Sequence, residues 1–186
     1  MANRLTRIVT RGGDKGETSL GDGTRIPKTD ARIALMGEAD ELNSSIGVVL
    51  AHHPGADISE ILVSVQHDLF DLGGALCLPG APLLSEGHVA RLDEAAARLN
   101  AGLAPLKEFA LPGGAPLPAF LHVARALCRR VERSFAAYLD RHPTEGMALP
   151  YLNRLSDLLF IAARFEAKRL GVPETLWRKA RSLAEK

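Results

Sequence analysis

The residues with the clearest chemical potential are arginines on one predicted helix. Arg125, Arg129 and Glu132 fall on the same helical face, with Arg133 at its edge. Arginines four residues apart repel each other, and this spacing is best accommodated when an anion, or carboxylates from another helix, lies between them. A solvated face on which Arg129 pairs with Glu132 is the simpler interpretation of the spacing alone.

Asn153 and Asp157 form a second polar pair on the next predicted helix. They are four residues apart and therefore share a face. Asn153 there could bind a ligand, and two ordinary surface polar residues are the alternative.

Asp40 lies in a small polar stripe on the first predicted helix. Two glycines, Gly37 and Gly47, flank it. A glycine inside a helix costs about 1 kcal/mol relative to alanine, so the pair indicates close approach by another group. If Asp40 lay beside Arg125, the two would form a buried ion pair whose disruption would be costly.

The segment from Thr10 to Lys28 is rich in glycine and poor in large apolar side chains. Its backbone N–H groups are open, and Arg11, Thr18 and Ser19 add a cation and two hydroxyls, which together suit a phosphate cradle. The segment contains neither GxxxxGK[ST] nor GxGxxG. Composition alone slightly favours a flexible tail instead.

Apolar periodicity predicts five long helices that must position these residues. We expect an all-α, up-and-down bundle, and the absence of a Glu-x-x-His pair gives no support to a ferritin-like di-iron site. The proposed division is a glycine-rich segment (1–29), the bundle (30–172) and a C-terminal short helix or tail (173–186). The expected helices are 29/30–53, 57–76, 85–103, 117–140/141 and 147–170.

Composition narrows the class of protein. The 186 residues carry 23 Lys and Arg against 22 Asp and Glu, a net charge of +1, which argues against a nucleic-acid binder. No apolar run approaches the roughly 18 residues of a membrane span, and we expect no signal peptide. Cys77 and Cys128 lie in apolar stretches; free thiols in a cytoplasmic protein are the favoured interpretation, and a disulfide remains the alternative.

Four blocks in order resemble the PduO-type ATP:cob(I)alamin adenosyltransferase family, and together they span nearly the whole chain. The blocks are residues 10–20 with Lys28, residues 37–44, residues 109–114, and residues 125–133 with residues 151–157.

The resemblance implies a five-helix bundle similar to the ferritin-like class, assembled as a homotrimer. It also implies ATP bound between subunits, Mg²⁺ on the triphosphate, and an N-terminal segment that orders over the nucleotide. Asp40 and Arg125 would form an intersubunit ion pair, and Phe109 would press on the corrin face and displace its lower ligand. The implied phosphate contacts are Thr10, Arg11, Gly12, Gly13, Thr18, Ser19 and Lys28. The other implied nucleotide-site residues are Arg129, Arg130, Val131, Glu132, Arg133 and Asn153.

The implied reaction transfers the 5′-deoxyadenosyl group of ATP to cob(I)alamin, after reduction of cob(II)alamin, and releases triphosphate. Reduced cobalt is itself the nucleophile, so catalysis depends on positioning and charge neutralisation rather than on a side-chain base. An electron-donating reductase and an adenosylcobalamin-dependent client enzyme are the implied partners. Two other functions stay open: an ATP-hydrolysing or phosphoryl-transferring bundle, and a non-catalytic assembly or cobalamin chaperone.

Overall fold

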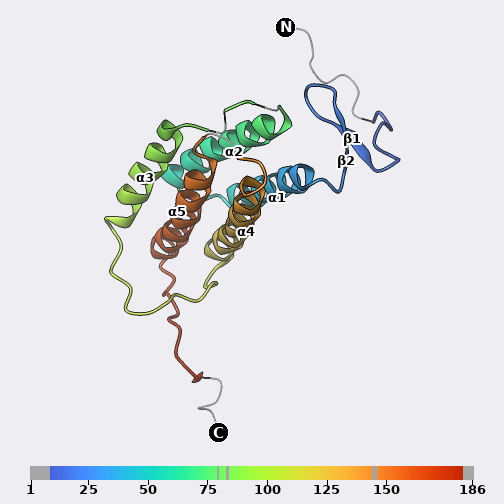
Figure 1. Ribbon diagram of the computed structural model, residues 1–186. Coiled ribbons are helices and arrows are strands. Elements are labelled where there is room, and N and C mark those ends of the chain that lie inside the picture. The colour runs from blue at the N-terminus through green and yellow to red at the C-terminus, as the bar shows by residue number, and fades with distance from the viewer. Residues whose placement is uncertain (1–8, 79, 83, 144–145, 182–186) are drawn as a thin grey trace.

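Five helices form a bundle, which confirms the all-α class (Figure 1). The computed structural model describes residues 9–78, 80–82, 84–143 and 146–181. Among these residues no helix is long and apolar enough to cross a membrane. The helices are α1 (Ala31–Ala51), α2 (Ala56–Cys77), α3 (Glu86–Asn100), α4 (Pro116–Leu139) and α5 (Ala148–Arg169).

The helices begin where the local sequence offers a cap. The carboxylate of Asp30 accepts a hydrogen bond from the Arg32 backbone N–H at 2.8 Å and starts α1. Ser85 and His88 form a reciprocal capping box at the start of α3. Gly171, with φ of +68°, follows the end of α5 in the left-handed conformation that favours glycine. The expected helix starts at Asp30 and Ser85 are therefore confirmed.

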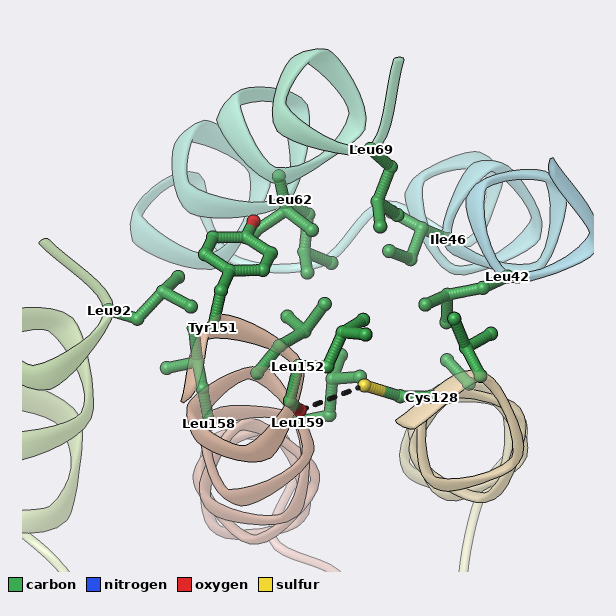
Figure 2. Packing of buried hydrophobic residues seen from close by; sticks show 14 of the residues in the cluster. Leu42, Ile46, Leu62, Leu69, Leu92, Cys128, Tyr151, Leu152, Leu158 and Leu159 are labelled. Atoms are coloured by element: carbon green, nitrogen blue, oxygen red, sulfur yellow. Dashed lines mark hydrogen bonds between the residues drawn. The ribbon is translucent and has the colours of Figure 1, made fainter. Parts of the chain in front are cut away.

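The core lies where α4 packs between α1 and α5, with α2 on α1 and α3 on α5. Cys128 is fully buried there, and its thiol donates to the Leu152 carbonyl at 3.2 Å (Figure 2). Burial raises the pKa of this thiol, so it stays protonated and unreactive. Both cysteines are free; Cys77, however, is only half-buried. The core residues that Figure 2 labels are Leu42, Ile46, Leu62, Leu69, Leu92, Cys128, Tyr151, Leu152, Leu158 and Leu159.

A buried carboxylate joins three helices. Asp68 of α2 accepts a hydrogen bond from the Tyr151 hydroxyl of α5 at 2.6 Å, and it forms an ion pair with Arg91 of α3. Asp68 is 5% exposed, so water cannot replace a lost donor. Burial, followed by the charge of Asp68, raises the pKa of Tyr151, which keeps its hydroxyl as a donor.

Tyr151→Phe should therefore lower the free energy of unfolding by about 1.5–3 kcal/mol, the range for a hydrogen bond to a charged group. Urea denaturation measures the change. The matched control is Tyr138→Phe, because its hydroxyl accepts from the half-buried Arg32 side chain at 3.1 Å and does not contact Asp68. Equal losses in the two variants would contradict a special role for the Asp68 contact.

The glycine-rich segment contains an ordered hairpin. Strand β1 (Glu17–Ser19) pairs antiparallel with β2 (Arg25–Pro27), and Thr18 lies opposite Ile26. The turn is fixed to the end of α2, because the Gly21 backbone N–H donates to the Cys77 carbonyl at 2.9 Å. A flexible tail is thus wrong for this part of the segment.

The segment after α5 forms a strand-like contact in place of a helix. Residues 174–180 contain no helix, and Leu176 makes an isolated antiparallel bridge to Ala110 in the α3–α4 connection; residues 182–186 of the expected C-terminal segment lie outside the described residues. Of the two expected forms, a short helix or a tail, the helix is therefore absent from these residues. Figure 1 shows this segment and the β-hairpin at opposite ends of the bundle.

Candidate active site

The hairpin, α1 and α2 enclose a cleft of about 1200 Å³, called here the hairpin cleft. Thr18, Ser19 and Lys28 line it from the hairpin, and Asp40 lines it from α1. Asp40 is exposed on this surface. The structure therefore brings together four of the residues predicted from the sequence.

The glycine-rich loop before β1 lies close to the Lys28 ammonium. A Cβ at Gly13 would be 2.9 Å from Lys28 Nζ, so glycine leaves room for the ammonium above the backbone. Arg25 fixes the loop by donating to the Gly12 carbonyl at 2.9 Å and to Ser19 Oγ at 3.3 Å. Open backbone, hydroxyls and cations in one place suit phosphate oxygens. Thr10, Arg11 and Gly12 are exposed beside this loop but do not line the cleft.

The hairpin cleft has an apolar side that the sequence analysis did not predict. Met36, Leu78 and Phe70 line it, and Phe70 is 70% exposed. Gly73 and Gly74 of α2 also line it, and a Cβ at either would meet nothing within 4 Å. Adjacent glycines inside a helix were the signal that could have identified this surface, as Gly37 did on the α1 side of the cleft.

A second depression of about 530 Å³ lies between α4 and α5 and is called the α4–α5 hollow. Arg129 and Arg133 are exposed there. Glu132 accepts from Asn153 Nδ2 at 2.9 Å, and the side-chain Oδ1 of Asn153 accepts from Arg154 at 3.2 Å. Glu132 thus binds Asn153 rather than Arg129, so the pairing expected for a simple solvated face is not formed. Arg129 and Arg133 form no ion pair with the described residues, so the hollow presents two guanidinium groups beside a fixed amide, an arrangement that suits an anion.

Two residues predicted for the nucleotide site do not line this hollow. Arg130 forms an ion pair with Glu41 of α1. Val131 is fully buried in the core, so its side chain cannot reach a nucleotide. Consecutive residues of a helix point in different directions, which separates Val131 from the exposed Arg129 and Arg133; its place among the nucleotide-site residues stays a prediction.

Arg125 and Asp40 do not meet within the chain. The Nε of Arg125 is buried and has no hydrogen-bond partner among the described residues, although the side chain is only half-buried. No ion pair joins it to Asp40 in the described part of the chain. A buried guanidinium nitrogen without a partner is costly, so this position favours an acceptor from outside the protomer.

Phe109 lies in the α3–α4 connection, a segment that Figure 1 shows away from the β-hairpin. Its side chain is 76% exposed, which is unusual for a residue of this size. One protomer therefore carries the predicted residues in three separate places.

His122 lies in the helical turn that precedes Arg125, and its Nδ1 has no partner among the described residues. Burial, followed by the charge of Arg125, lowers its pKa below the ordinary value of 6.5, against a smaller opposite effect of Glu174. The folded state therefore binds this proton less readily than the unfolded state.

Between pH 6.5 and the lower pKa of folded His122, the free energy of unfolding should fall as the pH falls, because the unfolded chain gains the proton first. Urea denaturation at several pH values in this range measures the slope. His122→Gln should reduce it, and the control His67→Gln, exposed on α2, should keep it. Identical slopes in all three proteins would contradict this assignment.

No group of three or more His, Cys, Asp or Glu side chains within the described ranges could hold a metal ion. Mg²⁺, however, commonly takes one or two carboxylates and otherwise binds substrate phosphates and water. Glu132 supplies a carboxylate in the α4–α5 hollow and fits that limited role.

An all-α bundle with an arginine-lined hollow and a glycine-rich hairpin defines a helical protein suited to an anionic ligand such as a nucleotide. Residues 8–166 match the model of the family described as cobalamin adenosyltransferase, and the chain belongs to that family.

Relatives of known name match this chain over most of its length and most of their own. A cobalamin adenosyltransferase of Cupriavidus metallidurans is 46% identical over 97% of this chain and 99% of its own. A corrinoid adenosyltransferase of Mycobacterium tuberculosis is 49% identical over 88% of this chain and 90% of its own. A PduO-type ATP:corrinoid adenosyltransferase variant from Lactobacillus reuteri, solved with cobalamin and ATP, superposes with a TM-score of 0.87 at 32% identity, over 93% of this chain and 100% of the other. The family, the fold class and the adenosyltransferase activity expected from the sequence are confirmed.

Proposed function

We propose that the chain transfers the 5′-deoxyadenosyl group of ATP to cob(I)alamin at sites shared between neighbouring subunits of a homotrimer. One observation carries this proposal: the chemically complementary groups lie on separate surfaces of one protomer. The hairpin cleft holds hydroxyls and Lys28, and the α4–α5 hollow holds Arg129 and Arg133. A rotational assembly places one surface of each subunit against the other surface of its neighbour.

The unpaired groups support the same assembly. Arg125 has a buried nitrogen without a partner, and Asp40 is exposed at the hairpin cleft. An intersubunit ion pair between them would satisfy both and would tie subunit contact to site formation.

In this arrangement Arg129 and Arg133 of one subunit bind the triphosphate of ATP, and Asn153 is held in place for the nucleotide by Glu132 and Arg154. The hairpin residues Thr18, Ser19 and Lys28 of the neighbour cover the phosphates. We propose that the glycine-rich segment 1–29, of which residues 1–8 lie outside the described residues, acts as a lid on the bundle of residues 30–172. Mg²⁺, held by phosphate oxygens and Glu132, would neutralise further charge.

The chemistry needs no side-chain base. The electron pair of reduced cobalt forms a bond to C5′ of ATP, the bond from C5′ to oxygen breaks, and triphosphate leaves with the electron pair of the broken bond. The protein contributes alignment of the attacking cobalt with C5′ and cations placed where the leaving group gains charge.

Phe109 is proposed to act on the corrinoid. Its exposed ring provides an apolar surface that can occupy the lower axial position of cobalt and exclude the axial ligand and water. Four-coordinate cob(II)alamin accepts an electron more readily than a ligated form. The solved Lactobacillus reuteri relatives include one variant with a phenylalanine replaced by alanine and one with an arginine replaced by lysine, the two residue types that this site uses.

The reaction indicates which partner proteins and which cellular compartment the enzyme needs. Cob(II)alamin needs one electron, so we propose an electron-donating reductase as a partner, and an adenosylcobalamin-dependent enzyme as the recipient of the product. Two free thiols and the use of ATP fit a cytoplasmic location.

An anaerobic assay with cob(I)alamin and ATP tests the proposed function. Adenosylcobalamin and triphosphate in equal amounts support it. ADP or inorganic phosphate would instead indicate a phosphoryl-transferring or ATP-hydrolysing enzyme. Binding of both ligands without any product would indicate a cobalamin chaperone.

Asp40→Asn should lower adenosyl transfer by about tenfold or more and weaken subunit assembly, because the amide cannot neutralise Arg125. Steady-state kinetics and sedimentation velocity measure the two effects. Glu94→Gln, an exposed carboxylate on α3, is the charge-matched control and should change neither. Unchanged kinetics and assembly in Asp40→Asn would remove Asp40 from the site.

A further inference from the structure

The loop that carries Phe109 is paired with the segment after α5. The Trp177 backbone N–H donates to the Phe109 carbonyl at 2.7 Å, and the Leu111 backbone N–H donates to the Thr175 carbonyl at 2.8 Å. Ala110 and Leu176 form the bridge between these two hydrogen bonds. The backbone position of Phe109 therefore depends on where the C-terminal segment lies.

A buried ion pair fixes that segment to the bundle. Arg164 of α5 is 8% exposed, and its Nε and Nη2 donate to the two carboxylate oxygens of Glu174 at 2.6 and 3.2 Å. The same Nη2 donates to the Ala104 carbonyl at 2.8 Å, at the start of the α3–α4 connection. One planar guanidinium thus holds both the C-terminal segment and the beginning of the connection that carries Phe109.

The far end of the connection contacts the same segment. Gly114 has a φ of +90°, and a Cβ there would lie 2.9 Å from Val172 Cγ1. Only glycine combines this backbone conformation with such close approach. The connection is therefore fixed on both sides of Phe109, while the Phe109 side chain itself stays exposed.

We propose that residues 172–177, anchored by the Arg164–Glu174 ion pair, are a strap that positions Phe109 against the corrinoid, so that Arg164 and Glu174 are positioning residues for the reaction. The inference rests on the proposed role of Phe109. An exposed aromatic ring on a long connection would sample many orientations, and the strap restricts its backbone before the substrate arrives.

The strap has a built-in reporter, because Trp177 is the only tryptophan of the chain. Glu174→Ala removes the anchor from the strap side and leaves the buried helix α5 intact, so the bundle should still fold. Glu174→Gln keeps one acceptor oxygen for Arg164 and should rescue part of the effect.

In the ATP-bound protein, electron paramagnetic resonance measures the fraction of four-coordinate cob(II)alamin. Glu174→Ala should lower this fraction by about fivefold or more, while adenosylation of pre-reduced cob(I)alamin and the KM for ATP should change by less than about twofold. In the ligand-free protein, acrylamide quenching of Trp177 fluorescence should increase. For Glu174→Gln, both the four-coordinate fraction and the quenching should lie between the values of Glu174→Ala and the wild type.

Lys168→Ala is the matched control. Lys168 lies one turn after Arg164 and donates to the Gly102 carbonyl at 2.6 Å, so it also binds the α3–α4 connection but does not contact the strap through this bond. This variant should match the wild type in both readouts.

Three outcomes separate the alternatives. If Trp177 quenching is unchanged in Glu174→Ala, the ion pair does not anchor the strap and the proposal is wrong. If quenching rises while the four-coordinate fraction stays at the wild-type value, the strap does not position Phe109. If Phe109→Ala itself leaves that fraction unchanged, the proposed role of Phe109 fails first, and the strap has no group to position.

Discussion

Replacing Arg129 by alanine should lower adenosyl transfer by about 100-fold or more and leave the bundle folded and assembled. The Arg129 side chain is exposed in the α4–α5 hollow, and alanine is a better helix former than arginine, so the substitution removes charge without disturbing α4. The loss should appear in the chemical step, because the negative charge of triphosphate grows as the bond to C5′ breaks. Single-turnover kinetics with cob(I)alamin measures it.

The control for this variant is Arg98→Ala, which removes the same charge from an exposed position in the last turn of α3. It should keep wild-type kinetics. Arg129→Lys keeps the charge but loses the planar pair of donors, and should recover only part of the activity. If Arg129→Ala retains wild-type turnover, the α4–α5 hollow is not the triphosphate site.

Replacing Phe109 by alanine should leave ATP binding intact and slow turnover from cob(II)alamin by about tenfold or more, equivalent to about 1.4 kcal/mol in the barrier. The ring is exposed, so its removal costs the fold little. Without it, water or the lower ligand returns to cobalt and the electron is accepted less readily. Turnover from cob(II)alamin with a fixed reductant, compared with turnover from pre-reduced cob(I)alamin, isolates this step.

Leu111→Ala is the matched control, because Leu111 is a second exposed apolar residue of the same connection and its backbone hydrogen bond to Thr175 survives the substitution. It should retain most of the cob(II)alamin-dependent rate. Comparable cob(II)alamin reduction in Phe109→Ala and the wild type would refute the role of the ring.

The helices could be predicted from the sequence because their signals are local. Apolar periodicity and the capping residues Asp30 and Ser85 fix where α1 and α3 begin. The short strands β1 and β2 carry no such periodic signal. The residues after Glu174 look helical in isolation, but their backbone groups pair with Phe109 and Leu111, more than sixty residues earlier in the chain. Such long-range pairing leaves no mark in a local pattern.

The site was predictable in residue type and only partly in geometry. Arginine spacing on α4 identified Arg129 and Arg133, which line the hollow. The same periodicity places Val131 on the apolar side of α4, where the structure buries it, so a contiguous motif was a poorer guide than helical geometry. The apolar side of the hairpin cleft around Phe70 escaped because an exposed phenylalanine in a helix looks like a core residue. The separation of the hairpin cleft from the α4–α5 hollow could not be predicted, because it depends on how the helices pack.

The central claim is that each active site takes its hairpin from one subunit and its α4 arginines from the next, and subunit complementation tests it most directly. Lys28→Ala and Arg129→Ala subunits, each nearly inactive alone, are co-expressed in equal amounts and purified as mixed assemblies. Random mixing gives about one quarter of the boundaries an intact Lys28 from one subunit and an intact Arg129 from its neighbour, so about one quarter of wild-type activity should return. Activity no greater than that of the separate variants would contradict a site shared between subunits.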